Sequence, residues 1–173
     1  MNGFIVVNLK SGMLLFSRDY TKDQNFGFSE PFEGNNDGPG PIQSNDPMNL
    51  ASYFFANIKM VDMMAEEVAK RNTEMSPEAR EATQQQLEMG FTGLETDGNS
   101  FVISRSHEFQ LLFVVFYNSD RFEKSWAEGL VHKIMDIFTY KYERKLKSNR
   151  ATSFDSFDQA LTVIYQDTIK DML

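Results

Sequence analysis

The stretch FQLLFVVFYN, residues 109–118, is apolar at nearly every position. An uninterrupted apolar run of this length is typical of a β-strand that is covered on both faces. A second such run, FIVVNL, occupies residues 4–9, where only Asn8 is polar. Strands that are covered on both faces belong in the middle of a sheet. We therefore expect these two distant segments to pair with each other.

The strand at residues 4–9 opens a predicted β-hairpin. The residues KSG at 10–12 have turn chemistry, and a strand-like pattern resumes over residues 13–20. This second strand alternates apolar and polar side chains, so we expect it at the edge of the sheet. Alternation would place three of its side chains on one face: Leu14, Phe16 and Arg18.

The chain then leaves the strand pattern. Residues 21–45 are rich in Gly, Asn and Pro, which predicts a long flexible loop. An Asp-Pro pair starts an amphipathic helix predicted over residues 46–61, and Leu50 and Phe54 lie in its apolar stripe. Residues 65–90 are polar and favour helix, which predicts a helical insertion. It is either a solvated excursion or a partner-binding arm that orders on contact.

The second half of the chain completes the pattern. Two short strand signals flank an Asp-Gly turn pair and precede the run at 109–118. A long amphipathic helix follows from about residue 121, and a closing helix from about residue 157. The sequence thus predicts one α+β domain over residues 1–173. Its sheet would have five mainly antiparallel strands in the order 2-1-5-4-3, with one helix on one face and two on the other.

This succession resembles the longin fold, a profilin-like architecture. Longin domains occur in longin SNAREs, adaptor sigma subunits, TRAPP tethering subunits, the signal-recognition-particle receptor and longin-containing Rab activators. The loop at 21–45 and the insertion at 65–90 depart from the compact sigma subunits. The segments that carry the likeness are GFIVVNLKSGMLLFSRDY at 3–20, FQLLFVVFYNSDRFEKSWAEGLVHKIMDIFTYKYE at 109–143 and FDSFDQALTVIYQDTI at 154–169.

The resemblance implies a non-enzymatic scaffold subunit of intracellular vesicle and membrane trafficking. Its partners would be proteins: another longin or roadblock-type subunit, a small GTPase or a coat subunit. We expect a cytoplasmic location, peripheral to endomembranes, with membrane contact only through a complex. In such families the sheet and its first helix are common contact surfaces. The expected partner-binding residues are therefore Leu14, Phe16, Arg18, Leu50 and Phe54.

The predicted long helix ends in the strongest concentration of positive charge in an acidic chain. Cations at a helix C-terminus complement the helix dipole. The alternative interpretation is contact with anionic lipid headgroups or with an acidic partner. The residues concerned are Lys141, Arg144, Lys145, Lys147 and Arg150.

Several kinds of chemistry are not expected. The chain has no cysteine, which excludes disulfides and thiolate sites, and its net charge of −8 argues against non-specific nucleic-acid binding. His107 and His132 lie far apart in the sequence, which argues against a shared metal site, and no nucleophile arrangement is recognisable. We therefore expect that the protein has no enzymatic activity and binds no cofactor. No apolar run approaches the ~20 residues of a membrane span, and no signal peptide is recognisable.

Two other functions remain open from the sequence. The chain is similar to the signal-recognition-particle receptor domain, which would make it a GTPase-binding module in protein targeting. A profilin- or PAS-like sensory module is the second. Such a module would hold a small ligand in a cavity with convergent polar groups between sheet and helix.

Overall fold

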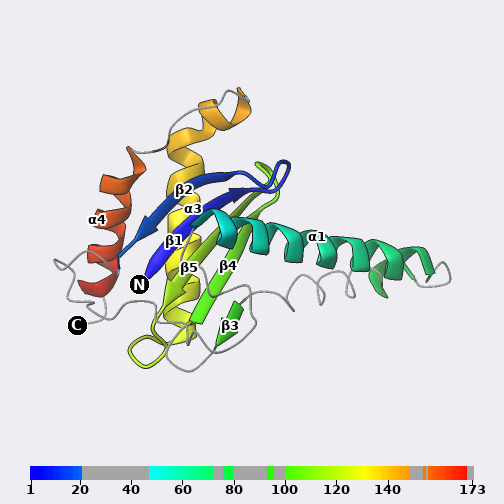
Figure 1. The fold of residues 1–173 in the computed structure, drawn as a ribbon, viewed down its shortest axis with the longest axis horizontal. Coiled ribbons are helices and arrows are strands. Elements are labelled where there is room, and N and C mark those ends of the chain that lie inside the picture. The colour runs from blue at the N-terminus through cyan, green and yellow to red at the C-terminus, as the bar shows by residue number, and fades with distance from the viewer. Residues whose placement is uncertain are drawn as a thin grey trace.

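The computed structural model describes residues 1–20, 47–71, 76–79, 93–95, 100–148, 154 and 156–170 (Figure 1). The predicted flexible loop at 21–45 lies outside these residues. The strands are β1 (Gly3–Asn8), β2 (Leu14–Asp19), β3 (Gly93–Glu95), β4 (Ser100–Ser106) and β5 (Leu111–Tyr117). The helices are α1 (Pro47–Arg71), α3 (Lys124–Lys147) and α4 (Phe157–Lys170).

The sheet has the order β2-β1-β5-β4-β3, and each neighbouring pair is antiparallel. Strand β1 lies beside β5 in the middle, with Ile5 opposite Val114. Every residue of β5 is buried, as is every residue of β1 except its last. The two apolar runs thus take the central positions because only there is each covered on both faces. The α+β class and the pairing of these two runs are confirmed.

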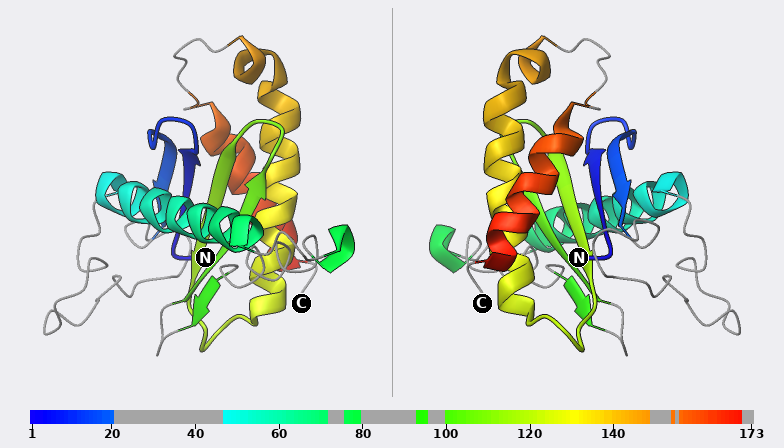
Figure 2. Two further views of the ribbon diagram at one scale, coloured as in Figure 1. Left: turned by 90° about the vertical axis from the view of Figure 1, so that its right-hand side faces the viewer. Right: turned by 90° about the vertical axis from the view of Figure 1, so that its left-hand side faces the viewer.

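Helices cover both faces of the sheet. Helix α1 lies on one face, and α3 and α4 lie on the other, as the two side views show (Figure 2). Side chains alternate between these layers along each central strand. In β1, Phe4 and Val6 pack toward α3 and α4, whereas Ile5 and Val7 pack toward α1.

Aromatic side chains fill both layers. On the α3 side, Phe138 is fully buried, and its ring centroid lies 5.5 Å from that of Phe113 and 4.9 Å from that of Phe157. On the α1 side, the ring centroids of Phe54 and Phe101 are 4.9 Å apart. Truncating a buried Phe of this kind costs about 3–5 kcal/mol, so the two layers hold much of the stability of the fold.

A β-bulge in β2 changes which side chains share a face. Val6 pairs with Phe16, but the next residue, Val7, pairs with Leu14, so Leu15 is an extra residue on the edge strand. An extra residue shifts the alternation by one position. Leu14 therefore packs toward α1, while Leu15 and Phe16 pack toward α3 and α4. The prediction that Leu14 shares a face with Phe16 is wrong for this reason.

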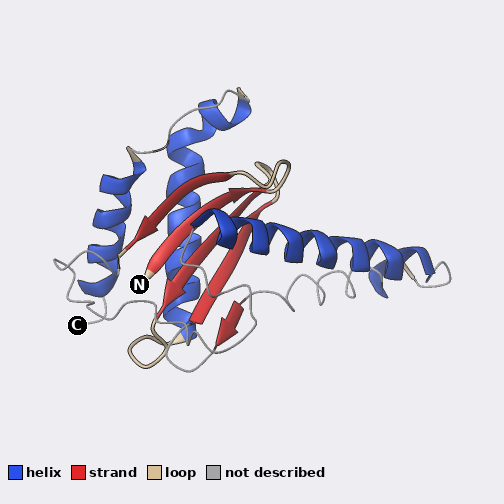
Figure 3. Cartoon of the chain, in the orientation of Figure 1, coloured by secondary structure: helices blue, strands red, loops and turns tan. Residues whose placement is uncertain are grey.

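Helix α1 is longer than the predicted helix over 46–61. It runs unbroken to Arg71, so the first residues of the predicted insertion at 65–90 are its last turns. Residues 77–79 are again helical, and the Ala79 amide donates to Ser76 Oγ at 3.3 Å, as in an N-cap. Most of the remaining insertion lies outside the described residues. Figure 3 shows α1 continuing beyond the edge of the sheet.

Candidate functional site

Three of the five predicted partner-binding residues belong to the core. The exposed fractions of Phe16, Leu50 and Phe54 are 8%, 8% and 1%. The ring of Phe16 packs edge-on against Phe157 of α4, with centroids 5.7 Å apart. The apolar stripe of the first helix faces the sheet because that is where its side chains leave water. Phe16 and Phe54 are therefore closed to a partner in this structure, whereas Leu50 reaches solvent at the wall of a hollow beside the start of α1.

Arg18 connects the edge strand to α4. Its Nε lies 3.2 Å from Asp158 Oδ1, and its guanidinium lies 5.6 Å from the centroid of the Tyr20 ring. A bulge and a charged side chain are two devices by which edge strands resist the addition of another strand. Strand β2 carries both, the bulge at Leu15 and the charge at Arg18. The β2 edge is therefore a poor template for strand addition.

The basic end of α3 is engaged within the molecule. Lys147 pairs with Glu143 on its own helix and, at 3.6 Å, with Glu108 in the β4–β5 turn. The hydrogen bond between Lys147 and Glu143 raises the pKa of Lys147 and lowers the pKa of Glu143. Lys141 donates to the Ser156 carbonyl oxygen at 3.1 Å.

Two more of the predicted cations have different surroundings. Lys145 lies 5.4 Å from the centroid of the Tyr142 ring, and Lys141 makes a similar contact with this ring at 5.6 Å. Arg144 is exposed, and Arg150 lies outside the described residues. The basic end thus links α3 to its neighbours, which leaves less of its charge for an anionic surface.

A different surface of α1 exposes three methionines, and it is bounded on the same side of the helix by exposed Ser52 and Glu67. We call it the outer face of α1. The exposed fractions of Met60, Met63 and Met64 are 55%, 69% and 53%, and Ala56 is also exposed. Residues spaced by three and four positions lie on one side of a helix, and this side is opposite to the one that buries Ile58. Sequence reasoning missed this face, although a second apolar stripe at helical spacing was present to indicate it.

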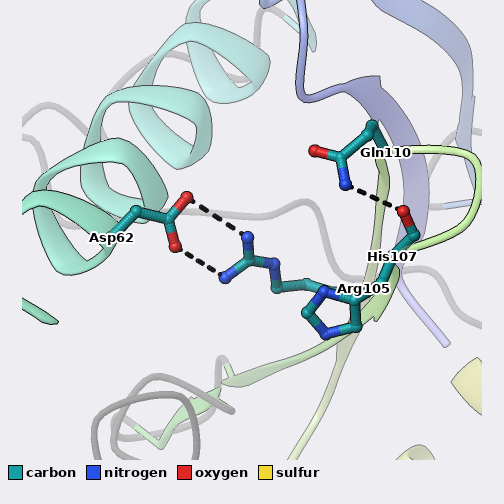
Figure 4. Close-up of polar contacts among 4 residues, drawn as sticks. All are labelled: Asp62, Arg105, His107 and Gln110. Carbon is teal, nitrogen blue, oxygen red and sulfur yellow. Dashed lines mark hydrogen bonds and ion pairs between the residues drawn. The ribbon is translucent and has the colours of Figure 1, made fainter. Parts of the chain in front are cut away.

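An ion pair fixes α1 against the sheet where the helix leaves it. Both Arg105 terminal nitrogens, from β4, donate to the two carboxylate oxygens of Asp62 at 2.9 and 3.2 Å (Figure 4). The side chains of Arg105 and Asp62 are 17% and 31% exposed. A bidentate pair of this kind fixes both distance and orientation. The ion pair therefore fixes the orientation of the outer face of α1 relative to the sheet.

The turn beside this ion pair is itself held in one conformation. The Gln110 side-chain amide donates to the His107 carbonyl oxygen at 2.8 Å, and the φ of Gln110 is 53° (Figure 4). The Leu9 amide donates to the Gln110 carbonyl oxygen at 2.8 Å. The ends of β1, β4 and β5 are thereby joined next to Arg105, which supports the position of the ion pair.

A buried cluster surrounds the N-terminal amine. The Met1 amine donates to the Tyr165 hydroxyl at 3.0 Å, and the Tyr165 ring stacks on Tyr20. Burial, with the charge of Arg121, lowers the pKa of the amine from 8.0 to about 4. Burial, with a smaller contribution from Tyr20, raises the pKa of Tyr165. Shifted pKa values mark candidate sites, but these groups are closed off from solvent, so we assign them a structural role.

An open hollow lies where α1 begins. It is open to solvent, and its walls include Ser17, Asp19, Leu50 and Phe116. The walls are mainly apolar, and their polar side chains come from β2 and from Asn2, which precedes β1. Within the described part of the chain, no group of three His, Cys, Asp or Glu side chains could hold a metal ion.

None of the described helices is both long enough and apolar enough to span a bilayer.

Comparison with known proteins assigns no family to the chain. No protein-family model matches the chain, and no curated protein matches it.

Proposed function

We propose that this chain is a non-enzymatic scaffold of longin type that acts in intracellular vesicle and membrane trafficking by binding other proteins. The observation that supports this proposal is the arrangement of the elements. A hairpin, a helix on one face, a three-stranded meander and two helices on the other face form one layered unit. This is the architecture that the resemblance to longin domains implies.

The outer face of α1 is the proposed contact surface. Exposed methionines in adjacent turns form an apolar surface that water does not favour and that a partner would cover. Thioether side chains are flexible and polarizable, so they adapt to the shape of a partner. The spacing of Ala56, Met60 and Met63 suits packing against an apolar helix or groove. The partner is a small GTPase, another longin or roadblock-type subunit, or a coat subunit.

The test is a binding assay with the full chain. We would measure binding to purified small GTPases, loaded with GDP or with a non-hydrolysable GTP analogue, and to longin, roadblock-type and coat subunits. The test variant is Met60→Arg with Met63→Arg. The control is Val163→Arg on α4, because Val163 is as exposed as Met60, at 55%.

We expect at least one partner to bind the native chain and the Val163→Arg variant equally. The double variant should bind at least about tenfold more weakly, which corresponds to 1.4 kcal/mol. Both variants should melt within a few degrees of the native chain, since the changed side chains are exposed. If no member of the panel binds, the trafficking proposal fails. If the double variant binds normally, the outer face is not the contact surface.

A further inference from the structure

The methionines in the described part of the chain divide into an exposed and an enclosed group. The exposed fractions of the three on the outer face of α1 lie between 53% and 69%, and Met13 and Met48 are exposed to 58% and 59%. Met1, by contrast, is fully buried, and Met135 is half-buried at the edge of the α3 layer. The sulfur of Met135 also accepts a hydrogen bond from Ser104 Oγ at 3.4 Å. Access of a small oxidant to sulfur should therefore differ strongly between these positions.

The chain offers oxidants no thiol. It has ten methionines and no cysteine, so the thioether is its only oxidisable sulfur group. In a protein with an exposed cysteine of low pKa, its thiolate would compete for a peroxide. Among the sulfur groups of this chain, only methionine can accept an oxygen atom from a peroxide that reaches the surface.

We infer that the outer face of α1 is a site of reversible methionine oxidation, with Met60, Met63 and Met64 as the modified residues and a peroxide as the oxidant. The O–O bond of hydrogen peroxide breaks and an S=O bond forms on the thioether. The sulfur loses two electrons, and the peroxide is reduced to water. Methionine sulfoxide reductases perform the reverse conversion at the expense of a thiol reductant.

The position of the three side chains decides what oxidation would do. A sulfoxide is polar and accepts hydrogen bonds, so it disrupts an apolar environment. On the outer face of α1, water can hydrate the new group, and the fold loses little. The face itself changes from apolar to polar. The regulatory consequence rests on the proposed function: oxidation should weaken partner binding without unfolding the chain.

The modification can be tested without a partner. The full chain is treated with graded hydrogen peroxide, quenched and digested, and each methionine is followed by peptide mass spectrometry. Met60, Met63 and Met64 should be oxidised at least about tenfold faster than Met1 and Met135. The melting temperature should change by no more than a few degrees, and the reductases should restore the original mass. Equal rates at the enclosed positions, or loss of the folded state, would overturn the inference.

The effect on binding is tested with the partner identified above. The variant with Met60, Met63 and Met64 replaced by Leu keeps an apolar face and cannot be oxidised there. The control is Met13→Leu with Met48→Leu, which removes two other exposed methionines. Peroxide should weaken binding of the native chain and of the control, but not of the triple variant. An equal loss of binding in the triple variant would contradict the assigned site. The peptide mapping needs no partner, so failure of the oxidation inference and failure of the proposed function are distinguishable.

Discussion

The ion pair between Asp62 and Arg105 should hold α1 against the sheet. We would replace each residue by Ala, singly and together, and measure the free energy of unfolding of all four proteins. Such a cycle isolates the interaction energy of the pair from other effects of each substitution. The matched control is the Glu66–Lys70 pair on the same helix, which has a distance of 4.0 Å and side chains that are each 73% exposed.

The structure sets the expected size of the interaction. Exposed ion pairs contribute about 0.2–1 kcal/mol, whereas hydrogen bonds to charged groups contribute about 1.5–3 kcal/mol. The Asp62–Arg105 pair has two hydrogen bonds, and its side chains are 31% and 17% exposed. We therefore expect an interaction energy of about 1.5 kcal/mol. The Glu66–Lys70 pair should give less than about 0.5 kcal/mol.

Urea denaturation followed by circular dichroism would measure these free energies. For a chain of this size, 1 kcal/mol corresponds to a shift of about 2–4 °C in melting temperature, so thermal melts provide a second measurement. Hydrogen exchange should also accelerate in the α1 residues beyond Asp62 in the Arg105→Ala variant. An interaction energy no larger than that of Glu66–Lys70 would refute the view that this pair fixes the helix.

Three other perturbations test separate parts of the fold. The Met1 amine has a pKa of about 4 when folded and 8.0 when unfolded, so the unfolded chain binds its proton more tightly and stability falls as pH drops below 8. The free energy of unfolding should be roughly 2 kcal/mol lower at pH 6 than at pH 8. Nα-acetylation should abolish this difference, and an equal free energy of unfolding at the two pH values would contradict the buried amine. Gly12→Ala should destabilise by about 1–2 kcal/mol, because the φ of Gly12 is +72° and a Cβ would lie 3.1 Å from the Phe55 ring. The control Gly129→Ala in α3, where a Cβ meets nothing within 4 Å, should stabilise by about 0.5–1 kcal/mol; the same sign for both would refute the argument. Phe138→Ala should cost about 3–5 kcal/mol in chemical denaturation, and a cost below about 1 kcal/mol would mean that the α3 layer is not the main core.

The sequence by itself determined the class of fold and its centre. The runs at residues 4–9 and 109–118 are short, apolar at successive positions and rich in Val, Ile and Phe, which is typical of a strand covered on both faces. The helical stripes of α3 and α4 were equally local signals, since their period of 3–4 residues needs no knowledge of the partner layer. These features follow from the order of apolar and polar residues along short segments.

Only the tertiary structure decided which side chains remain at the surface. The bulge at Leu15 arises from pairing between strands, and it moves Leu14 to the α1 side of the sheet. Helix α1 carries apolar side chains on two sides, and packing on the sheet decides that Phe54 is buried and Met60 exposed. Glu108 and Lys147 are far apart in sequence and meet only because α3 returns to the β4–β5 turn. Local patterns specify which segments are apolar, but exposure depends on contacts between distant segments, which no local pattern contains.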